Sequence, residues 1–268
     1  TVNYSVTDDN GKSDNSSFVI NLTGTNDAPQ ATFDTEKFTN EGQSIQGQLT
    51  SVDIDVDDVA TYQLKQSGVD QTRIESAAIA VANAVTANDQ AQIADAQRYQ
   101  SLLNSFETQI TNNNGDIPGL NLDSTTGSWS FDPTDDIYKT LAAGDELVLR
   151  VQYQAEDSNG LTGDNSFLIT VTGTNDAPVA TFSDPQNATE DQNAPLTGQL
   201  TANDVDSSDL QYELIGAQIP GLNIDSNGDW SFDTTDEAYQ NLADGESKQI
   251  TVNYSVTDDN GKSDNSSF

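Results

Sequence analysis

The sequence predicts an all-β chain of tandem antiparallel β-sandwiches, the first complete one carrying an inserted α-helical hairpin. Three observations support this prediction. The sequence repeats itself at two levels, the repeats contain short runs of alternating apolar and polar residues, and one segment that interrupts the first repeat has helical periodicity. With 268 residues, the chain is long enough for two or three domains of ordinary size.

The repeat is visible at both ends of the chain. Residues 1–18 recur without change as residues 251–268, and LTGTNDAPQATF at residues 22–33 returns as VTGTNDAPVATF at residues 171–182. We therefore expect residues 1–29 to be the C-terminal strands of a preceding repeat. Residues 30–178 should form a full sandwich with a helical insertion at about 67–114, and residues 179–268 a second sandwich without its last strand.

Within a repeat, the apolar residues alternate with polar ones as they do in half-buried strands. The alternating positions are Leu149, Val151, Tyr153 and Ala155 in one copy and Ile250, Val252, Tyr254 and Val256 in the other. Asn-Gly pairs mark turns at Asn159-Gly160 and Asn260-Gly261. About seven short strands in about a hundred residues are typical of an Ig-like sandwich, whose core should include Trp129 and Trp230.

The insertion predicts two helices. Residues 70–86 are rich in alanine, with Ile74, Ala77, Ala78, Val81 and Val85 on one stripe. Asn88-Asp89 should cap a second helix, in which Ile93, Ala96, Leu103, Phe106 and Ile110 recur at helical spacing. Two helices bury little surface alone, so the stripe must pack either on the parent sandwich or on a neighbouring chain.

The composition excludes several classes of function. Nine Lys and Arg residues stand against 44 Asp and Glu, a formal charge of −35, which disfavours binding to nucleic acid and to anionic membranes. The chain has no Cys and no His, so it lacks disulfides and the usual zinc ligands. No apolar run is long enough for membrane insertion. The charge is either a solubilising surface, as in halophiles, or is neutralised by bound cations.

The positions of the acidic residues favour bound cations. They recur at predicted strand ends and loops, where hard oxygen ligands can surround Ca²⁺, and a D-x-D on an extended loop presents both carboxylates on one face. The alternative, that Asp and Asn simply favour turns, explains this set less well. The candidate ligands are Asn26, Asp27, Glu41, Asp53, Asp55, Asp136, Asp157, Asn175, Asp176, Glu190, Asp204, Asp206 and Asp258.

The GTNDAP ending, the D-x-D and the Y-x-x-x-D-x-x-G loop resemble bacterial cadherin-like repeats of the VCBS type. Such repeats build the extender regions of giant surface adhesins, including those of the RTX family. The resemblance implies a secreted or cell-surface location, a role in adhesion and biofilm, and calcium held between successive domains. It departs from cadherins in lacking the second linker Asn and the mid-domain acidic triad, and the helical hairpin is not part of the usual module.

The resemblance also implies how the ligands divide between two junctions. Around the central junction it groups Glu41, Asp136, Asn175, Asp176, Asp204, Asp206 and Asp258. Around the preceding junction it groups Asn26, Asp27, Asp53, Asp55 and Asp157. Glu190 is the counterpart of Glu41 in the second repeat. An EF-hand is excluded, because the sixth and twelfth positions from Asp53 are Asp58 and Leu64 where Gly and Glu are needed.

The sequence is compatible with three kinds of function, which it supports to different degrees. The first is a calcium-rigidified extender, whose partners are the adjacent repeats of the same chain. The alternative is a self-assembling extracellular matrix fibre, in which identical chains meet through the helical hairpin or by strand addition. An enzyme is disfavoured: Asp57-Asp58 or Asp135-Asp136 resemble a glycosidase pair, but the acids recur once per repeat at domain edges, as a structural ion site does.

Overall fold

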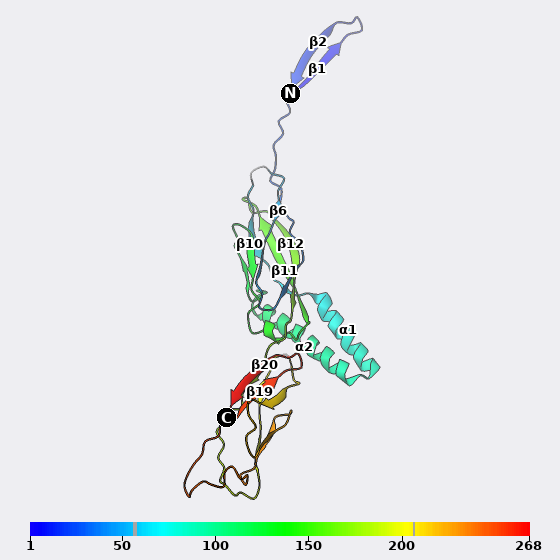
Figure 1. Cartoon of the computed structure of the whole chain (residues 1–268). Helices are drawn as coiled ribbons and strands as arrows, with labels where there is room; N and C mark the ends of the chain where they lie inside the picture. The colour runs from blue at the N-terminus through cyan, green and yellow to red at the C-terminus, as the bar shows by residue number, and fades with distance from the viewer. Residues whose placement is uncertain (56–57, 206) are drawn as a thin grey trace.

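The computed structural model describes residues 1–55, 58–205 and 207–268. The elements lie in an elongated row (Figure 1): an N-terminal hairpin, an extended linker, a sandwich with two helices at its side, and a second sandwich. The hairpin pairs β1 (Val2–Thr7) with β2 (Ser13–Phe18). The predicted all-β class with an inserted helical hairpin is confirmed.

The first sandwich has two main sheets. One is β5 (Ile45–Gln48), β10 (Ser128–Phe131) and β9 (Leu120–Leu122). The other runs β4 (Lys37–Asn40), β12 (Thr162–Thr172), β11 (Glu146–Glu156) and β7 (Thr61–Leu64), with β8 (Gly68–Val69) also on β11. A short pair joins β3 (Gln30–Ala31) to β6 (Ser51–Val52), and a 3₁₀ turn covers Tyr138–Thr140. All of these pairs are antiparallel except β4 with β12, which is parallel.

The second sandwich repeats most of this plan. One sheet is β14 (Leu196–Gln199), β18 (Asp229–Phe232) and β17 (Leu222–Ile224), and the other is β16 (Gln211–Leu214), β19 (Asn253–Thr257) and β20 (Ser263–Ser267). The short pair is β13 (Val179–Ala180) with β15 (Ala202–Asn203). The corresponding strands therefore place corresponding loops at the same end of each sandwich.

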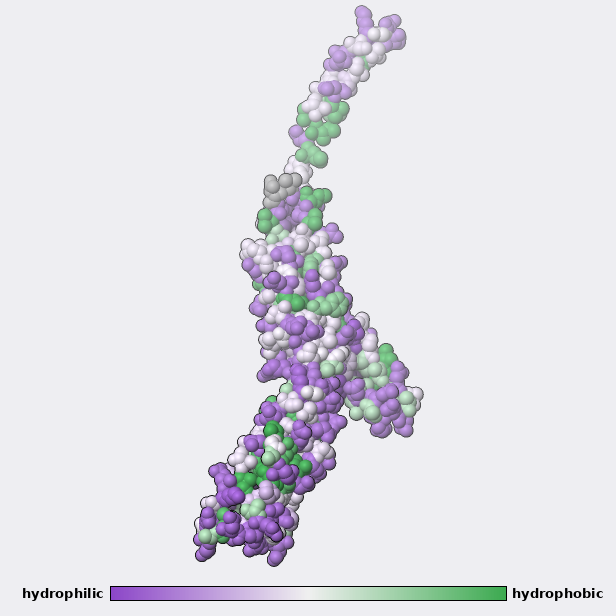
Figure 2. Space-filling model, in the orientation of Figure 1, coloured by the Kyte–Doolittle hydropathy of each residue, from purple (hydrophilic) through white to green (hydrophobic). Residues whose placement is uncertain are grey.

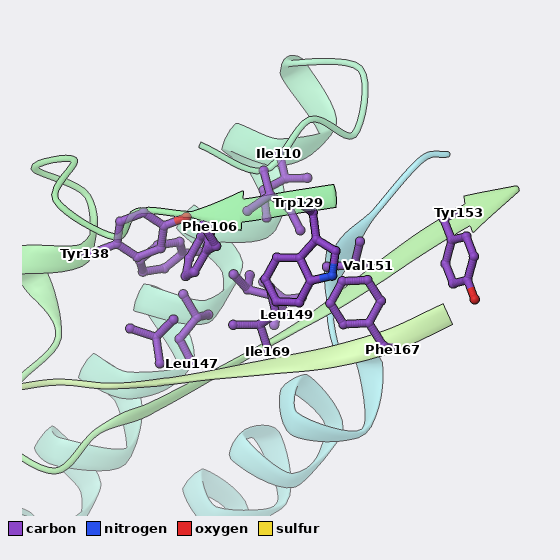
Figure 3. Packing of buried hydrophobic residues seen from close by; sticks show 14 of the residues in the cluster. Phe106, Ile110, Trp129, Tyr138, Leu147, Leu149, Val151, Tyr153, Phe167 and Ile169 are labelled. Atoms are coloured by element: carbon purple, nitrogen blue, oxygen red, sulfur yellow. The ribbon is translucent and has the colours of Figure 1, made fainter. Parts of the chain in front are cut away.

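Aromatic side chains fill the cores, as the alternating pattern predicts. In the first sandwich Trp129 from one sheet packs on Phe167 from the other, with ring centroids 5.1 Å apart (Figure 3). Trp230 packs on Phe268 in the same way, at 5.2 Å. A glycine faces each indole: a Cβ on Gly47 would lie 2.4 Å from the Trp129 ring. The strand opposite the tryptophan therefore has to carry glycine there.

The helical hairpin consists of α1 (Gln71–Ala87) and α2 (Gln90–Asn112), capped by Asp70 and Asp89. Leu103, Phe106 and Ile110 of α2 belong to the core of the first sandwich, with exposures of 0, 0 and 1%. Of the two possible partners for the stripe, the parent sandwich is thus the one that these three residues contact.

The rest of the hairpin projects from the sandwich (Figure 1). Val85, predicted to lie on the buried stripe, is 55% exposed, because the C-terminal half of α1 extends beyond the sandwich. A bidentate contact from Arg98 to Asp145 (2.7 and 3.1 Å) holds α2 beside the strand that begins at Glu146. Figure 2 shows a mostly hydrophilic face, with apolar residues along the linker, where Val19, Ile20 and Leu22 are exposed.

Candidate metal sites at the domain junctions

Each junction is a linker that carries Asn-Asp and docks on a sandwich. We call the contact between Asn26-Asp27 and the first sandwich the first junction. At this junction the Asn26 amide donates a hydrogen bond to Asp157 Oδ2 (2.8 Å), and the Asp27 backbone N–H donates to Asp55 Oδ2 (2.8 Å). An open cleft of about 400 Å³ lies beside this contact, lined by linker residues and by Asp55, Asp58 and Asn159.

Three carboxylates converge at the first junction. Oxygen atoms of Asp53, Asp58 and Asp157 lie within 4.8 Å of one another, and Asp53 Oδ2 is buried without a hydrogen-bond partner among the residues that the structure describes. Sequence reasoning missed Asp58 as a ligand. The signal was present, since Asp53, Asp55 and Asp58 follow one another in a single loop. Like charges at this spacing repel each other, so the cluster favours a bound cation.

The loop between β11 and β12 positions Asp157 by local hydrogen bonds. Its Oδ1 accepts the backbone N–H groups of Asn159 (2.8 Å) and Leu161 (2.9 Å), which leaves Oδ2 facing the linker. Burial opposes the charge, but the hydrogen bonds from Asn26 and these amides outweigh it, so the pKa of Asp157 lies below its ordinary value. The side chain is therefore held ionised in the direction of the linker.

The central junction repeats this arrangement at Asn175-Asp176, with the second sandwich. The Asn175 amide donates to Asp258 Oδ2 (2.6 Å), whose Oδ1 accepts the N–H groups of Asn260 and Lys262 (2.9 Å each). In the adjoining D-x-D loop, Asp204 Oδ1 accepts the N–H of Ser207 (3.1 Å). Asp206, the other half of this D-x-D, lies outside the described residues.

Glu41 reaches the central junction from the first sandwich. The Glu41 residue is 8% exposed, its Oε1 accepts a hydrogen bond from the Thr174 hydroxyl (3.1 Å), and within the described part of the chain its Oε2 is buried without a hydrogen-bond partner. Burial raises the pKa of Glu41, and the Thr174 hydrogen bond offsets only part of that effect, while the neighbouring Asp176 raises the pKa further. A buried acid next to a second acid is the environment that a cation would relieve.

Two other predicted ligands have different surroundings. Asp136 is exposed and forms an ion pair with Lys139 (2.8 Å), whose hydrogen bond and charge lower the pKa of Asp136. Glu190 lies between β13 and β14, the position that Glu41 has in the first sandwich, and its Oε2 is likewise buried without a partner. Asp136 is therefore paired with a lysine. Glu190 resembles Glu41, because one oxygen of each carboxylate is buried.

The donor set is chemically uniform. Carboxylates, amide oxygens and backbone carbonyls line both junctions, and the chain has neither His nor Cys. Such all-oxygen sets suit hard cations such as Ca²⁺ and Mg²⁺ and do not suit zinc or copper. The buried oxygens of Glu41 and Asp53, for which residues 1–55, 58–205 and 207–268 supply no hydrogen-bond partner, fit a cation ligand better than a solvated acid.

The raised pKa of Glu41 predicts a pH effect. A folded-state pKa above the ordinary 4.5 means that the folded chain binds more protons, so without a cation its stability falls as pH rises from 4.5 through the raised pKa of Glu41. We expect Glu41→Gln to flatten that decline in EDTA, measured by urea unfolding at each pH. Glu75→Gln, at an exposed acid of α1, is the matched control; equal slopes in both variants would contradict the prediction.

Comparisons with known proteins agree with this fold. Residues 175–268 match the family described as bacterial Ig domain. A protocadherin gamma-B3 fragment of extracellular cadherin domains 1–4 superposes with a TM-score of 0.52 and 14% identity, covering 97% of this chain and 53% of that one. Two further solved structures are similar. Protocadherin gamma-B2 domains 1–5 have a TM-score of 0.49 and 17% identity, with 99% of this chain and 43% of that chain covered. Human CDH23 domains EC21-23 have a TM-score of 0.47 and 15% identity, with 98% of this chain and 70% of that chain covered. No curated protein sequence matches the chain.

The fold therefore places the chain in the class of Ig-like and cadherin-like β-sandwich repeats. Residues 175–268 match the bacterial Ig domain family, and the likeness to the protocadherin, at 14% identity, concerns the fold alone. The chain spans about half the length of that protocadherin fragment. Among the described residues, neither α1 nor α2 is apolar enough over sufficient length to cross a bilayer.

Proposed function

We propose that this chain is a calcium-rigidified extender segment of a large, secreted or cell-surface bacterial adhesin of the VCBS-repeat, RTX-adhesin type. One observation carries the proposal: at each junction a linker Asn binds an Asp of the next sandwich, and a nearby buried carboxylate oxygen has no hydrogen-bond partner among the described residues. Carboxylates gathered at a hinge repel each other, and a divalent cation would convert that repulsion into a bond between domains.

The proposed ligands at the first junction are Asn26, Asp27, Asp53, Asp55, Asp58 and Asp157. Those at the central junction are Glu41, Asn175, Asp176, Asp204, Asp206 and Asp258, with Asp136 at its rim and Glu190 serving the next junction. When bound, calcium supplies positive charge to which oxygens of both domains can coordinate. The protein's own residues set the geometry, because the Asx turns at Asp157 and Asp258 aim one oxygen at each linker.

The proposed partners are the adjacent repeats of the same chain, and the proposed role is mechanical. The same acids recur at corresponding loops of both sandwiches, as a repeated structural site requires and a single catalytic site does not. We therefore propose no enzymatic activity. A matrix fibre assembled through the α2 stripe is less well supported, since Leu103 and Phe106 are 0% exposed and unavailable to a second chain.

The proposal predicts a calcium-dependent change of shape. Small-angle scattering of the chain in EDTA should show a broad distribution of distances, because two repulsive junctions are free to bend. In millimolar calcium the distribution should become that of a rod, with a larger radius of gyration. Magnesium, which requires a tighter octahedral site, should have less effect. Identical scattering profiles in EDTA and calcium would rule out calcium rigidification.

A further inference from the structure

The two junctions differ at the second and fifth positions of a shared loop. The loop of the first sandwich reads Asp157-Ser-Asn-Gly-Leu161, and the loop of the second reads Asp258-Asp-Asn-Gly-Lys262. Both loops have the same hydrogen bonds from the fifth residue, since Leu161 N and Lys262 N each donate to the Oδ1 of the leading Asp (2.9 Å). The backbone is therefore equivalent, and two side chains differ. Asp259 takes the place of Ser158 and accepts hydrogen bonds from the Ser207 hydroxyl and the Asn260 amide (2.9 and 3.1 Å), and the ammonium of Lys262 takes the place of the apolar Leu161.

The Lys262 ammonium binds the linker of the central junction. Its Nζ donates a hydrogen bond to the backbone carbonyl of Asn175, the same residue whose side chain binds Asp258 and Asn260 (2.6 and 3.3 Å). A second lysine lies nearby, because the charge of Asp176 acts on Lys139 and raises its pKa, after the larger effects of Asp136. Two of the nine basic residues of the chain thus lie at the central junction.

The first junction has no lysine at the fifth loop position. Leu161, at the place of Lys262, is 41% exposed and cannot donate a hydrogen bond from its side chain. Among the described residues, the ion pairs of the chain include none to Asp53, Asp58 or Asp157. The carboxylates at this junction therefore depend on hydrogen bonds and on any cation from solution.

We propose that Lys262 is a built-in counter-ion of the central junction, an inference that rests on the proposed calcium function. Without calcium, its hydrogen bond to Asn175 keeps this linker docked. With calcium, its charge opposes the incoming ion, so Lys262 lowers the calcium affinity of the central junction. In a water-like medium, an ammonium a few ångströms from a divalent ion lowers affinity roughly tenfold.

The repeat extends this difference along the chain. Lys12 occupies the fifth position of the loop in residues 1–18, which are identical to residues 251–268. Loops with lysine and the loop with Leu161 therefore alternate in the order Lys12, Leu161, Lys262. The junctions along the rod would then alternate between tight and weak calcium sites, which lets calcium concentration set how many joints are rigid.

Calorimetric titration of the full chain with calcium tests the proposal. We expect a tight and a weak class of sites. Lys262→Leu should tighten the weak class about tenfold, and Leu161→Lys should weaken the tight class. Lys12→Leu is the matched control, because it makes the same change in an identical local sequence where no linker of this chain docks; it should change neither class. A weak class that is unaltered in Lys262→Leu overturns the proposal.

A second measurement separates this proposal from the calcium function on which it rests. In EDTA, hydrogen exchange at residues 173–178 should be faster in Lys262→Leu than in the parent chain or in Lys12→Leu, because the docking hydrogen bond is lost. Equal exchange in all three chains overturns the counter-ion role even if calcium binds. Absence of calcium binding to the parent chain would instead overturn the function proposed for both junctions.

Discussion

Replacing Phe106 by alanine should lower the free energy of unfolding of the first sandwich by about 3–5 kcal/mol. Phe106 is 0% exposed, and its ring lies 5.5 Å from that of Tyr138 in the core. Its removal leaves a cavity that the surrounding sheets cannot easily close. Urea unfolding followed by fluorescence measures the loss. A Trp230→Phe background reports the first sandwich alone, since the chain has two tryptophans, Trp129 and Trp230.

The control for Phe106→Ala lies on the same hairpin. Ile79 of α1 is 60% exposed, so Ile79→Ala should alter stability by no more than about 0.5 kcal/mol. If Phe106→Ala costs no more than Ile79→Ala, the hairpin is an appendage and not part of the core. The second sandwich shows the alternative arrangement, in which Lys248 covers the corresponding Tyr239 ring at 5.2 Å without any helix.

Calcium at 100 times its dissociation constant should raise the free energy of unfolding by about 2.7 kcal/mol per site. In EDTA, where no calcium is bound, the loss of acidic residues at the first junction should not lower the free energy of unfolding. Asp53→Asn with Asp58→Asn removes two charges from a cluster whose oxygens lie within 4.8 Å, so this double variant should be at least as stable as the parent. In calcium the variant should be less stable than the parent, because its ligands are gone.

This reversal between EDTA and calcium is the decisive feature of the second prediction. Chemical unfolding in both solutions, in the Trp230→Phe background, gives four free energies to compare. Asp9→Asn, at an exposed acid of the N-terminal hairpin, removes a charge far from the cluster and should not reverse the order. A double variant that is less stable than the parent in both solutions would mean that Asp53 and Asp58 stabilise the fold without a metal.

The sequence alone determined the architecture, because the features that specify it are periodic and local. Alternation around Val151 and Val252 fixes which face of each strand is buried, and the Asn-Gly pairs fix the turns. The helix cap at Asp89 was readable for the same reason, since a cap depends on residues two or three positions away. The recurrence of the Asn-Asp linkers likewise located both junctions.

Contacts between distant segments were decided only by the tertiary structure. Helical periodicity predicted the apolar stripe of α2. It did not predict which surface covers the stripe, because a stripe requires burial without specifying its partner. In the structure Phe106 packs on Tyr138, which lies 32 residues further along the chain. It also added Asp58 to the first junction, beside the distant Asp157. Charge pairing depends on distances of a few ångströms between loops, and residue spacing along the chain does not encode those distances.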